Sequence, residues 1–120
     1  MGYPEMDTVT TLTDTASAEA WRAVSGTSLC GYVTATREEI EAVFGAPTIS
    51  HNDTSDKVTT EWYLLFDDGL DTVATIYDWK RYGMGAPQAG ERIEWHIGGR
   101  SHTAPVRIAQ FLNKNVRAFL

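Results

Sequence analysis

The sequence predicts an α+β fold in which two main helices pack on a small antiparallel sheet of about four strands, preceded by an N-terminal arm or short helix. Three observations predict this class. Residues 58–66 alternate between apolar and polar side chains, as a half-buried strand does. The sequence Asp67-Asp68-Gly69 then marks a turn into a second strand. Thr36-Arg37-Glu38-Glu39 is a capping box that precedes apolar residues at helical spacing.

The N-terminal part, residues 1–35, is expected to contain an arm, a short helix and the first strand. Residues 1–14 are rich in threonine, aspartate and small side chains, which indicates a loose leader or a docking arm. Residues 17–24 favour a short helix that buries Trp21. Residues 29–35 favour the first strand.

Residues 36–120 are expected to form the α+β core of what is a single domain overall. The first main helix follows the capping box, turns Ile40, Val43 and Phe44 to the core, and ends at Gly45. The strands at 58–66 and 72–79 then pair as an antiparallel hairpin.

The last third of the chain supplies a loop, a strand and the second main helix. Residues 82–90 are rich in glycine and predict a flexible connection. Residues 92–97 alternate as a strand, and we expect Trp95, like Trp62, to lie in the core. A helix follows that begins near Ser101 or Thr103. Its apolar side comprises Ile108, Ala109, Leu112, Val116, Phe119 and Leu120.

Length and composition indicate one globular domain with a modest core, because the chain has 120 residues, of which 42% are hydrophobic and 22% charged. The single cysteine, Cys30, cannot form an intrachain disulfide, which favours a reducing compartment, and we expect it to be a small core side chain. No apolar run approaches the roughly 20 residues that span a bilayer. The expected location is therefore the cytoplasm.

The formal charge of −6 is unevenly distributed along the chain. Residues 1–78 hold three basic and fourteen acidic residues, a net charge of −11, whereas residues 79–120 hold seven basic and two acidic residues, a net charge of +5. The overall charge argues against duplex nucleic acid and anionic membranes as partners, since both require many phosphates to be neutralised. It allows a small anion. The two halves can also interleave in space and neutralise each other.

The first candidate site is Gly98-Gly99-Arg100-Ser101, where a strand is predicted to meet a helix. Free backbone N–H groups at a helix start, the helix dipole and one arginine together suit an anion such as phosphate. The alternative is structural: the two glycines allow a sharp turn and Ser101 is an ordinary helix cap.

The second candidate site is the string Tyr77-Asp78-Trp79-Lys80-Arg81 at the end of the hairpin. Tyr77 and Trp79 share one face of the strand and can stack on a nucleobase, and the two cations can neutralise phosphate. Asp78 can accept hydrogen bonds from a base edge or a ribose hydroxyl. The alternative is that both aromatic side chains continue the core.

Catalytic and metal-binding motifs are not evident, so the sequence predicts neither an enzyme nor a cofactor. The histidines His51, His96 and His102 have neither the spacing nor the cysteine partners of a zinc site. His96 is expected on the polar face of its strand, as a hydrogen-bonding group with the option of acting as a general base.

Several strings together resemble a family of short proteins encoded by tailed phages, identified here as the anti-CBASS sponge family. They are Thr36-Arg-Glu-Glu-Ile-Glu-Ala-Val-Phe-Gly-Ala-Pro, Lys57-Val-Thr-Thr-Glu-Trp, Phe66-Asp-Asp-Gly, Thr72-Val-Ala-Thr-Ile-Tyr-Asp-Trp-Lys80 and Glu94-Trp-His-Ile-Gly-Gly-Arg-Ser101, and they cover roughly residues 36–104. The resemblance implies an oligomer that binds cyclic dinucleotide immune signals without cleaving them. It also implies that the ligand pockets are lined by Tyr77, Trp79, Lys80, His96, Gly98, Gly99, Arg100 and Ser101.

The leading hypothesis is therefore a viral immune-evasion protein that sequesters a cyclic di- or oligonucleotide in the host cytoplasm as a homo-oligomer, a dimer or a tetramer. Its ligand phosphate is expected at the Gly98–Ser101 turn, and its base near Tyr77 and Trp79. The alternative is a protein-directed inhibitor whose acidic residues 1–78 mimic nucleic acid and block a host enzyme. A third hypothesis is a small nucleotide-handling enzyme.

Overall fold

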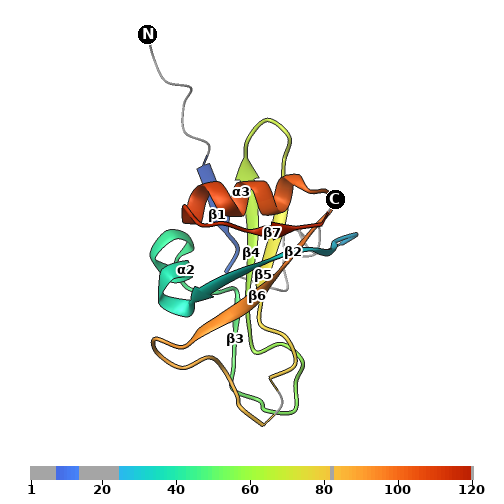
Figure 1. The fold of residues 1–120 in the computed structure, drawn as a ribbon. Helices are drawn as coiled ribbons and strands as arrows, with labels where there is room; N and C mark the ends of the chain where they lie inside the picture. Colours follow the sequence, from blue (N-terminus) through green and yellow to red (C-terminus); the bar gives the residue numbers. More distant parts are fainter. Residues whose placement is uncertain (1–7, 14–24, 82, 120) are drawn as a thin grey trace.

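The structure, a computed structural model, describes residues 8–13, 25–81 and 83–119. Within these ranges, seven strands form one antiparallel sheet with two helices packed against it (Figure 1). The sheet order is β1-β4-β5-β6-β2-β7, and β3 pairs separately with β4. The elements are β1 (Thr8–Thr11), β2 (Ser28–Thr36), α2 (Arg37–Phe44), β3 (Ile49–Ser50), β4 (Thr60–Asp67), β5 (Val73–Tyr77), β6 (Arg92–Gly99), α3 (Thr103–Leu112) and β7 (Arg117–Ala118).

The predicted fold class, with its sheet of about four strands, is wrong: the sheet has seven strands and dominates the fold. Strands hold 38% and helices 18% of the described residues. The sequence prediction missed β1, β3 and β7, which have only two to four residues each. Such short segments carry little periodicity, and they become strands because β4 and β2 offer them backbone hydrogen bonds. Strand β1 lies in the segment that was predicted to be a loose arm.

The four longer predicted strands and the first main helix are confirmed. Helix α2 begins with a complete capping box, in which the Thr36 hydroxyl accepts the Glu39 N–H at 3.1 Å and the Glu39 carboxylate accepts the Thr36 N–H at 2.9 Å. Ile40 and Phe44 are buried, whereas Val43 is 40% exposed and lies outside the core. The predicted helix at residues 17–24 lies outside the described residues.

The core lies between one face of the sheet and the two helices. The indoles of Trp62 on β4 and Trp95 on β6 are fully buried, meet edge to face at 5.4 Å, and donate their N–H groups to the carbonyls of Gly45 and Ala35. The prediction that both tryptophans are core residues is confirmed. Around them lie Val33, Ala35, Ile40, Phe44, Leu64, Phe66, Ala74, Ile76, Ile97, Ala104, Ile108 and Leu112.

The second main helix, α3, is shorter than predicted. It ends at Leu112 because Asn113 adopts the left-handed conformation (φ 53°, ψ 47°), which terminates a helix. Val116 and Phe119 therefore lie beyond the helix, and the chain returns as β7 along the edge of β2. The prediction that Val116 and Phe119 belong to the apolar side of the helix is wrong, and the predicted Leu120 lies outside the described residues.

Cys30 is buried and makes no disulfide, as expected. Within the described ranges, no helix is long and apolar enough to cross a membrane.

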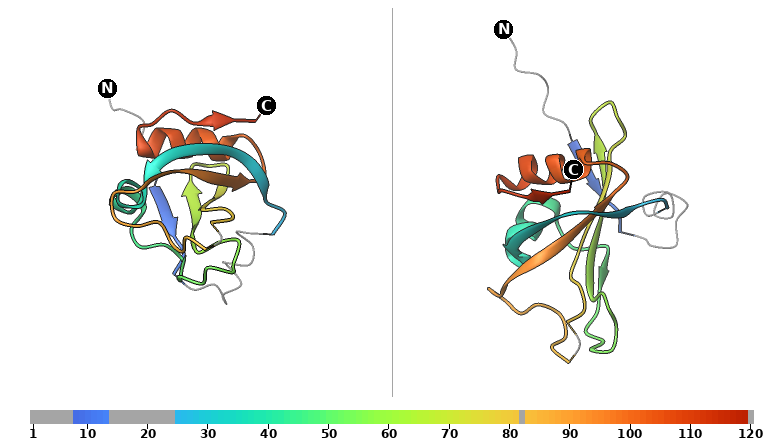
Figure 2. Two further views of the ribbon diagram at one scale, coloured as in Figure 1. Left: turned by 60° about the horizontal axis from the view of Figure 1, so that its bottom comes forward. Right: turned by 45° about the vertical axis from the view of Figure 1, so that its right-hand side comes forward.

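Two views of the molecule show that both helices gather on one face of the sheet, while the lower ends of the long strands extend beyond them (Figure 2). On β4 the core side chains Trp62, Leu64 and Phe66 alternate with Glu61, Tyr63 and Leu65, which point to the other face. We call this second side the open face.

Candidate ligand-binding cleft

A cleft of about 290 Å³ lies on the open face, across strands β4, β5 and β6. The strand register explains how residues distant in sequence meet there: Glu61 pairs with Tyr77, and Thr75 pairs with Gly98. The volume is at the lower end of the range for small-molecule sites. The lining residues are Thr27, Ser28, Val58, Glu61, Tyr63, Thr75, Tyr77, Trp79 and Gly98.

Gly98 keeps this cleft open because it has no side chain. A Cβ atom at this position would lie 2.5 Å from the Thr75 hydroxyl oxygen and 3.6 Å from a ring carbon of Tyr77. Gly98 was predicted as part of a phosphate-binding turn, but it lies within β6 and forms part of the cleft wall. The predicted strand at 92–97 is confirmed and continues for two further residues.

Three rings gather at one end of the cleft. Trp79 stacks on His96 with 5.7 Å between ring centroids and 28° between planes, and Tyr77 lies 6.1 Å from Trp79 and 5.4 Å from His96. The row continues through Tyr32, which meets His96 edge to face at 4.9 Å. The structure therefore brings together Tyr77, Trp79, His96 and Gly98 of the predicted site.

Trp79 is 39% exposed, which decides between the two interpretations of its role. The core alternative is wrong for Trp79, because this indole keeps a large part of its surface in solvent beside the cleft. Tyr77 is half-buried and belongs to the cleft wall. A partly exposed tryptophan next to a concavity can contact a planar ring.

The titratable groups of the open face are perturbed mainly by burial. Burial raises the pKa of Glu61 to about 7, and the nearby Asp78 carboxylate adds to the rise. Burial also raises the pKa of Tyr63 and of Tyr77, with a further contribution from Glu61 in each case. Burial lowers the pKa of His96, against the opposing effect of Glu94. A carboxyl group with a pKa raised to about 7 and an imidazole with a lowered pKa therefore lie on the open face beside Tyr77 and Trp79.

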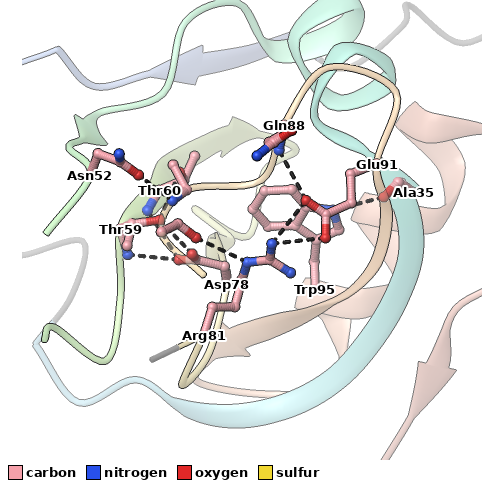
Figure 3. Close-up of polar contacts among 11 residues, drawn as sticks. Ala35, Asn52, Thr59, Thr60, Asp78, Arg81, Gln88, Glu91 and Trp95 are labelled. Atoms are coloured by element: carbon pink, nitrogen blue, oxygen red, sulfur yellow. Dashed lines mark hydrogen bonds and ion pairs between the residues drawn. The ribbon is translucent and has the colours of Figure 1, made fainter. Parts of the chain in front are cut away.

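Asp78 has a structural role beneath the site. Its side chain is fully buried, and its oxygens accept the N–H groups of Thr59 and Thr60 at 2.8 and 3.0 Å and the Thr59 hydroxyl at 2.5 Å (Figure 3). These bonds tie the end of β5 to the start of β4. The carboxylate that was predicted to face a base edge or a ribose is thus already bonded within the protein.

Arg81 is also bonded within the protein. Its guanidinium donates to both carboxylate oxygens of Glu91 at 2.8 Å and to the Gly85 carbonyl at 3.2 Å (Figure 3). Only 12% of the side chain is exposed. Its charge is therefore matched by Glu91, and we assign it to holding the loop of residues 83–91 in place.

Lys80 is the cation next to the aromatic cluster. Its ammonium lies 5.5 Å from the centre of the Trp79 ring, and its backbone N–H donates to the Lys57 carbonyl at 2.7 Å. The side chain is exposed and makes no ion pair with the described residues. Lys80 is therefore available to a ligand anion.

The remaining predicted residues, Gly99, Arg100 and Ser101, lie at the end of β6 and in the turn before α3. A Cβ atom on Gly99 would lie 2.4 Å from that of Ala104, so Gly99 allows the strand and helix to approach closely. The Arg100 guanidinium donates to the Ser25 carbonyl at 3.1 Å. The N-cap residue of α3 is His102, and no side chain caps the helix start, so the alternative in which Ser101 is an ordinary helix cap is wrong on this point. The Ser101 hydroxyl accepts the N–H of Thr103 at 3.3 Å.

The helix start also offers fewer N–H groups than the anion-site hypothesis requires. The N–H of Ala104 already donates to the Ser101 carbonyl, and Pro105 has no N–H. The tight turn of the structural alternative accounts for these contacts.

The acidic and basic halves of the chain do interleave in space. Among the described residues, ion pairs join Glu39 to both Arg92 and Lys114, and Asp68 to Arg107. Burial raises the pKa of Asp68, but hydrogen bonds from Thr72, Arg107 and the backbone outweigh it and hold the pKa below its usual value. The open charge expected of a nucleic-acid mimic is reduced accordingly.

Sequence reasoning missed Glu61, the acid of the cleft. The alternating pattern of β4 places Glu61 on the polar face, and the hairpin pairs it with Tyr77. Extending the predicted hairpin register by these few residues would have placed Glu61 beside the predicted aromatic site. Thr27 and Ser28 have no comparable sequence signal, because they reach the cleft through the pairing of β2 with β6. No group of three potential metal ligands occurs within the described ranges.

In comparisons with known proteins, no family model, no curated protein and no solved structure matches the chain.

Proposed function

We propose that the cleft on the open face binds the base of a nucleotide, and that the protein sequesters a cyclic di- or oligonucleotide signal without cleaving it. The observation that carries the proposal is the partly exposed indole of Trp79, clustered with Tyr77 and His96 at a cleft that contains an acid. Stacking of a base on an aromatic side chain contributes about 1–3 kcal/mol. The volume of about 290 Å³ suits a single base rather than a whole dinucleotide.

Lys80 supports the phosphate part of the proposal. The ammonium lies against the Trp79 ring, so a base stacked on this indole brings its phosphate within reach of the cation. Arg100 follows β6 beyond Gly98, whereas Lys80 follows β5 beyond Tyr77. Because β5 and β6 are antiparallel, these cations lie toward opposite ends of the open face. The Arg100 guanidinium is already bonded to the Ser25 carbonyl, so Lys80 is the cation assigned to the phosphate.

Three parts of the proposal rest on the resemblance of residues 36–104 to the phage sponge family. They are ligand sequestration, a role in viral immune evasion and a location in the host cytoplasm. A sponge requires slow release of its ligand and no catalytic group. It is proposed to act as a homo-oligomer, in which the rest of a dinucleotide contacts a second copy. Light scattering measures that state directly.

Isothermal titration with a panel of cyclic dinucleotides tests the proposal. Wild-type protein is expected to bind at least one member, and heat denaturation of the complex should release the ligand chemically intact. Trp79→Ala should weaken binding about 5- to 150-fold, the loss of one stacked base. Leu70→Ala, a change at an exposed hairpin position away from the cleft, is the matched control and should bind like wild type.

Three results would overturn the proposal. Absence of binding across the panel would show that the cleft does not bind these nucleotides, and release of a cleaved product would favour the nucleotide-handling enzyme instead. Salt-sensitive capture of a host nuclease, lost when Asp67, Asp68 and Asp71 are neutralised, would favour the acidic mimic.

A further inference from the structure

Glu61 is an acid in the cleft without a partner. Its carboxylate takes part in no hydrogen bond and no ion pair among the described residues, although it lies on the central strand pair of the open face. Glu61 is partly buried, and no fully buried side-chain oxygen or nitrogen of the described residues lacks a hydrogen-bond partner, so solvent in the cleft reaches the Glu61 carboxylate. A partner supplied from outside the chain would replace that water and hydrogen-bond the carboxylate.

The surroundings of Glu61 specify the chemistry of that partner. The neighbouring charged group is another carboxylate, that of Asp78, which is already saturated by Thr59 and Thr60. Tyr77 and Trp79 line the same cleft with aromatic surface. The missing partner is therefore flat, aromatic and equipped with hydrogen-bond donors.

We propose that the cleft selects guanine, with the Glu61 carboxylate accepting the adjacent N1–H and N2–H groups of the guanine edge. This inference rests on the proposed nucleotide function. Ionised carboxylates accept hydrogen bonds through both oxygens and donate none, so two parallel donors match them.

The other bases fit this acid less well. Adenine offers a donor at N6 beside an acceptor at N1, and the acceptor lone pair is repelled by the carboxylate. Uracil offers one N–H flanked by two carbonyl oxygens. A cleft whose carboxylate accepts two adjacent donors therefore discriminates against adenine and uracil, because neither base can satisfy both carboxylate oxygens.

Titration of guanosine and adenosine 5′-monophosphates tests the selectivity, since the two ligands carry the same sugar and phosphate. Wild-type protein is expected to bind the guanine nucleotide about 10- to 100-fold more tightly, the usual discrimination of a bidentate pair. Glu61→Gln should reduce this preference to less than about threefold, because the amide replaces one acceptor with a donor. Glu94→Gln, a change at an exposed glutamate that pairs with Arg117, is the matched control and should keep the preference.

The pH dependence of wild-type binding provides a second measurement that needs no variant. Guanine binding requires the ionised Glu61, so the preference for guanine over adenine should grow between pH 6 and pH 8. The titratable groups that face Glu61 are Asp78 after β5, Tyr77 on β5 and Tyr63 on β4, with His96 further along on β6. The phosphate titrates equally in the two ligands, so the ratio of their affinities isolates the base.

The outcomes separate this inference from the function on which it rests. Equal affinity for the two nucleotides, unchanged in Glu61→Gln, would overturn guanine selection and leave nucleotide binding standing. Failure of wild-type protein to bind either mononucleotide or any cyclic dinucleotide would overturn both.

Discussion

Replacing Asp78 with alanine tests whether this buried carboxylate organises the sheet beneath the cleft. The side chain is fully buried and accepts three hydrogen bonds from Thr59 and Thr60, at the start of β4. Asp78→Ala removes the acceptor and leaves two backbone N–H groups and one hydroxyl of Thr59 and Thr60 in a buried environment. The expected result is a large loss of stability.

The magnitude follows from the hydrogen bonds. A hydrogen bond to a charged group contributes about 1.5–3 kcal/mol, and a buried donor left without a partner costs about 1–3 kcal/mol. Water entering the space left by the carboxyl group recovers part of the loss, so three bonds correspond to about 3–5 kcal/mol. That is a large fraction of the roughly 5–15 kcal/mol by which domains are stable.

Urea denaturation, followed by tryptophan fluorescence, measures this loss. With a urea dependence of about 1–3 kcal/mol per molar, the midpoint should fall by roughly 2 M. Asp78→Asn keeps an acceptor for the backbone N–H groups and should lose less, about 1–2 kcal/mol. Asp67→Ala, an exposed position at the end of β4, is the control and should change stability by less than about 0.5 kcal/mol.

A loss below about 1 kcal/mol in Asp78→Ala would refute the structural role. The folded Asp78→Asn variant gives a second check, because a purely structural aspartate predicts unchanged nucleotide affinity. If Asp78→Asn lost nucleotide binding while its stability stayed unchanged, Asp78 would be a ligand contact after all.

Three further changes test other parts of the structure. Gly99→Ala places a Cβ atom 2.4 Å from that of Ala104 and should cost about 1–3 kcal/mol in a urea titration, part of which Ala104→Gly should restore. Asp68→Asn should lower the free energy of unfolding at pH 7, because it removes the ion pair with Arg107. Folding lowers the pKa of Asp68, so the ionised carboxylate stabilises the wild type, and the difference between variant and wild type should shrink as the pH falls below 3.8 and Asp68 is protonated. Glu61→Gln should be more stable than wild type at pH 8 and nearly equal to it at pH 4. Folding raises the pKa of Glu61 from 4.5 to about 7, so the wild type loses about 3 kcal/mol of its free energy of unfolding as the pH rises through this range.

Local signals in the sequence were sufficient for the elements that carry strong periodicity or caps. The capping box at Thr36 and the alternation of β4 each specify one conformation, and the structure has both. The short strands could not be predicted in this way. Thr8–Thr11 and Arg117–Ala118 become strands because long-range pairing with β4 and β2 satisfies their backbone groups, and that information does not lie within the segments.

The sequence predicted only those parts of the candidate site that depend on local patterns. Trp79 and Tyr77 are neighbours on one strand, so alternation alone placed them together. Gly98 was assigned to the correct region but to a turn, because glycine pairs are more typical of turns than of strands. Ser28 comes from a third strand, and its place in the cleft depends on the register of β2 against β6, which the sequence does not reveal.

Three unfavourable features of the folded chain meet at one place. Trp79 is 39% exposed, Glu61 keeps a partly buried carboxylate without a hydrogen bond, and Gly98 weakens a strand interior in which a side chain would pack. Elsewhere in the described core the tryptophans are buried with bonded N–H groups, and Asp78 is saturated by donors. Because the same chain satisfies these groups in its core, the exceptions at the cleft are unlike ordinary packing defects. All three become favourable when a flat ring with donors occupies the space, which is the strongest physical argument for a ligand there.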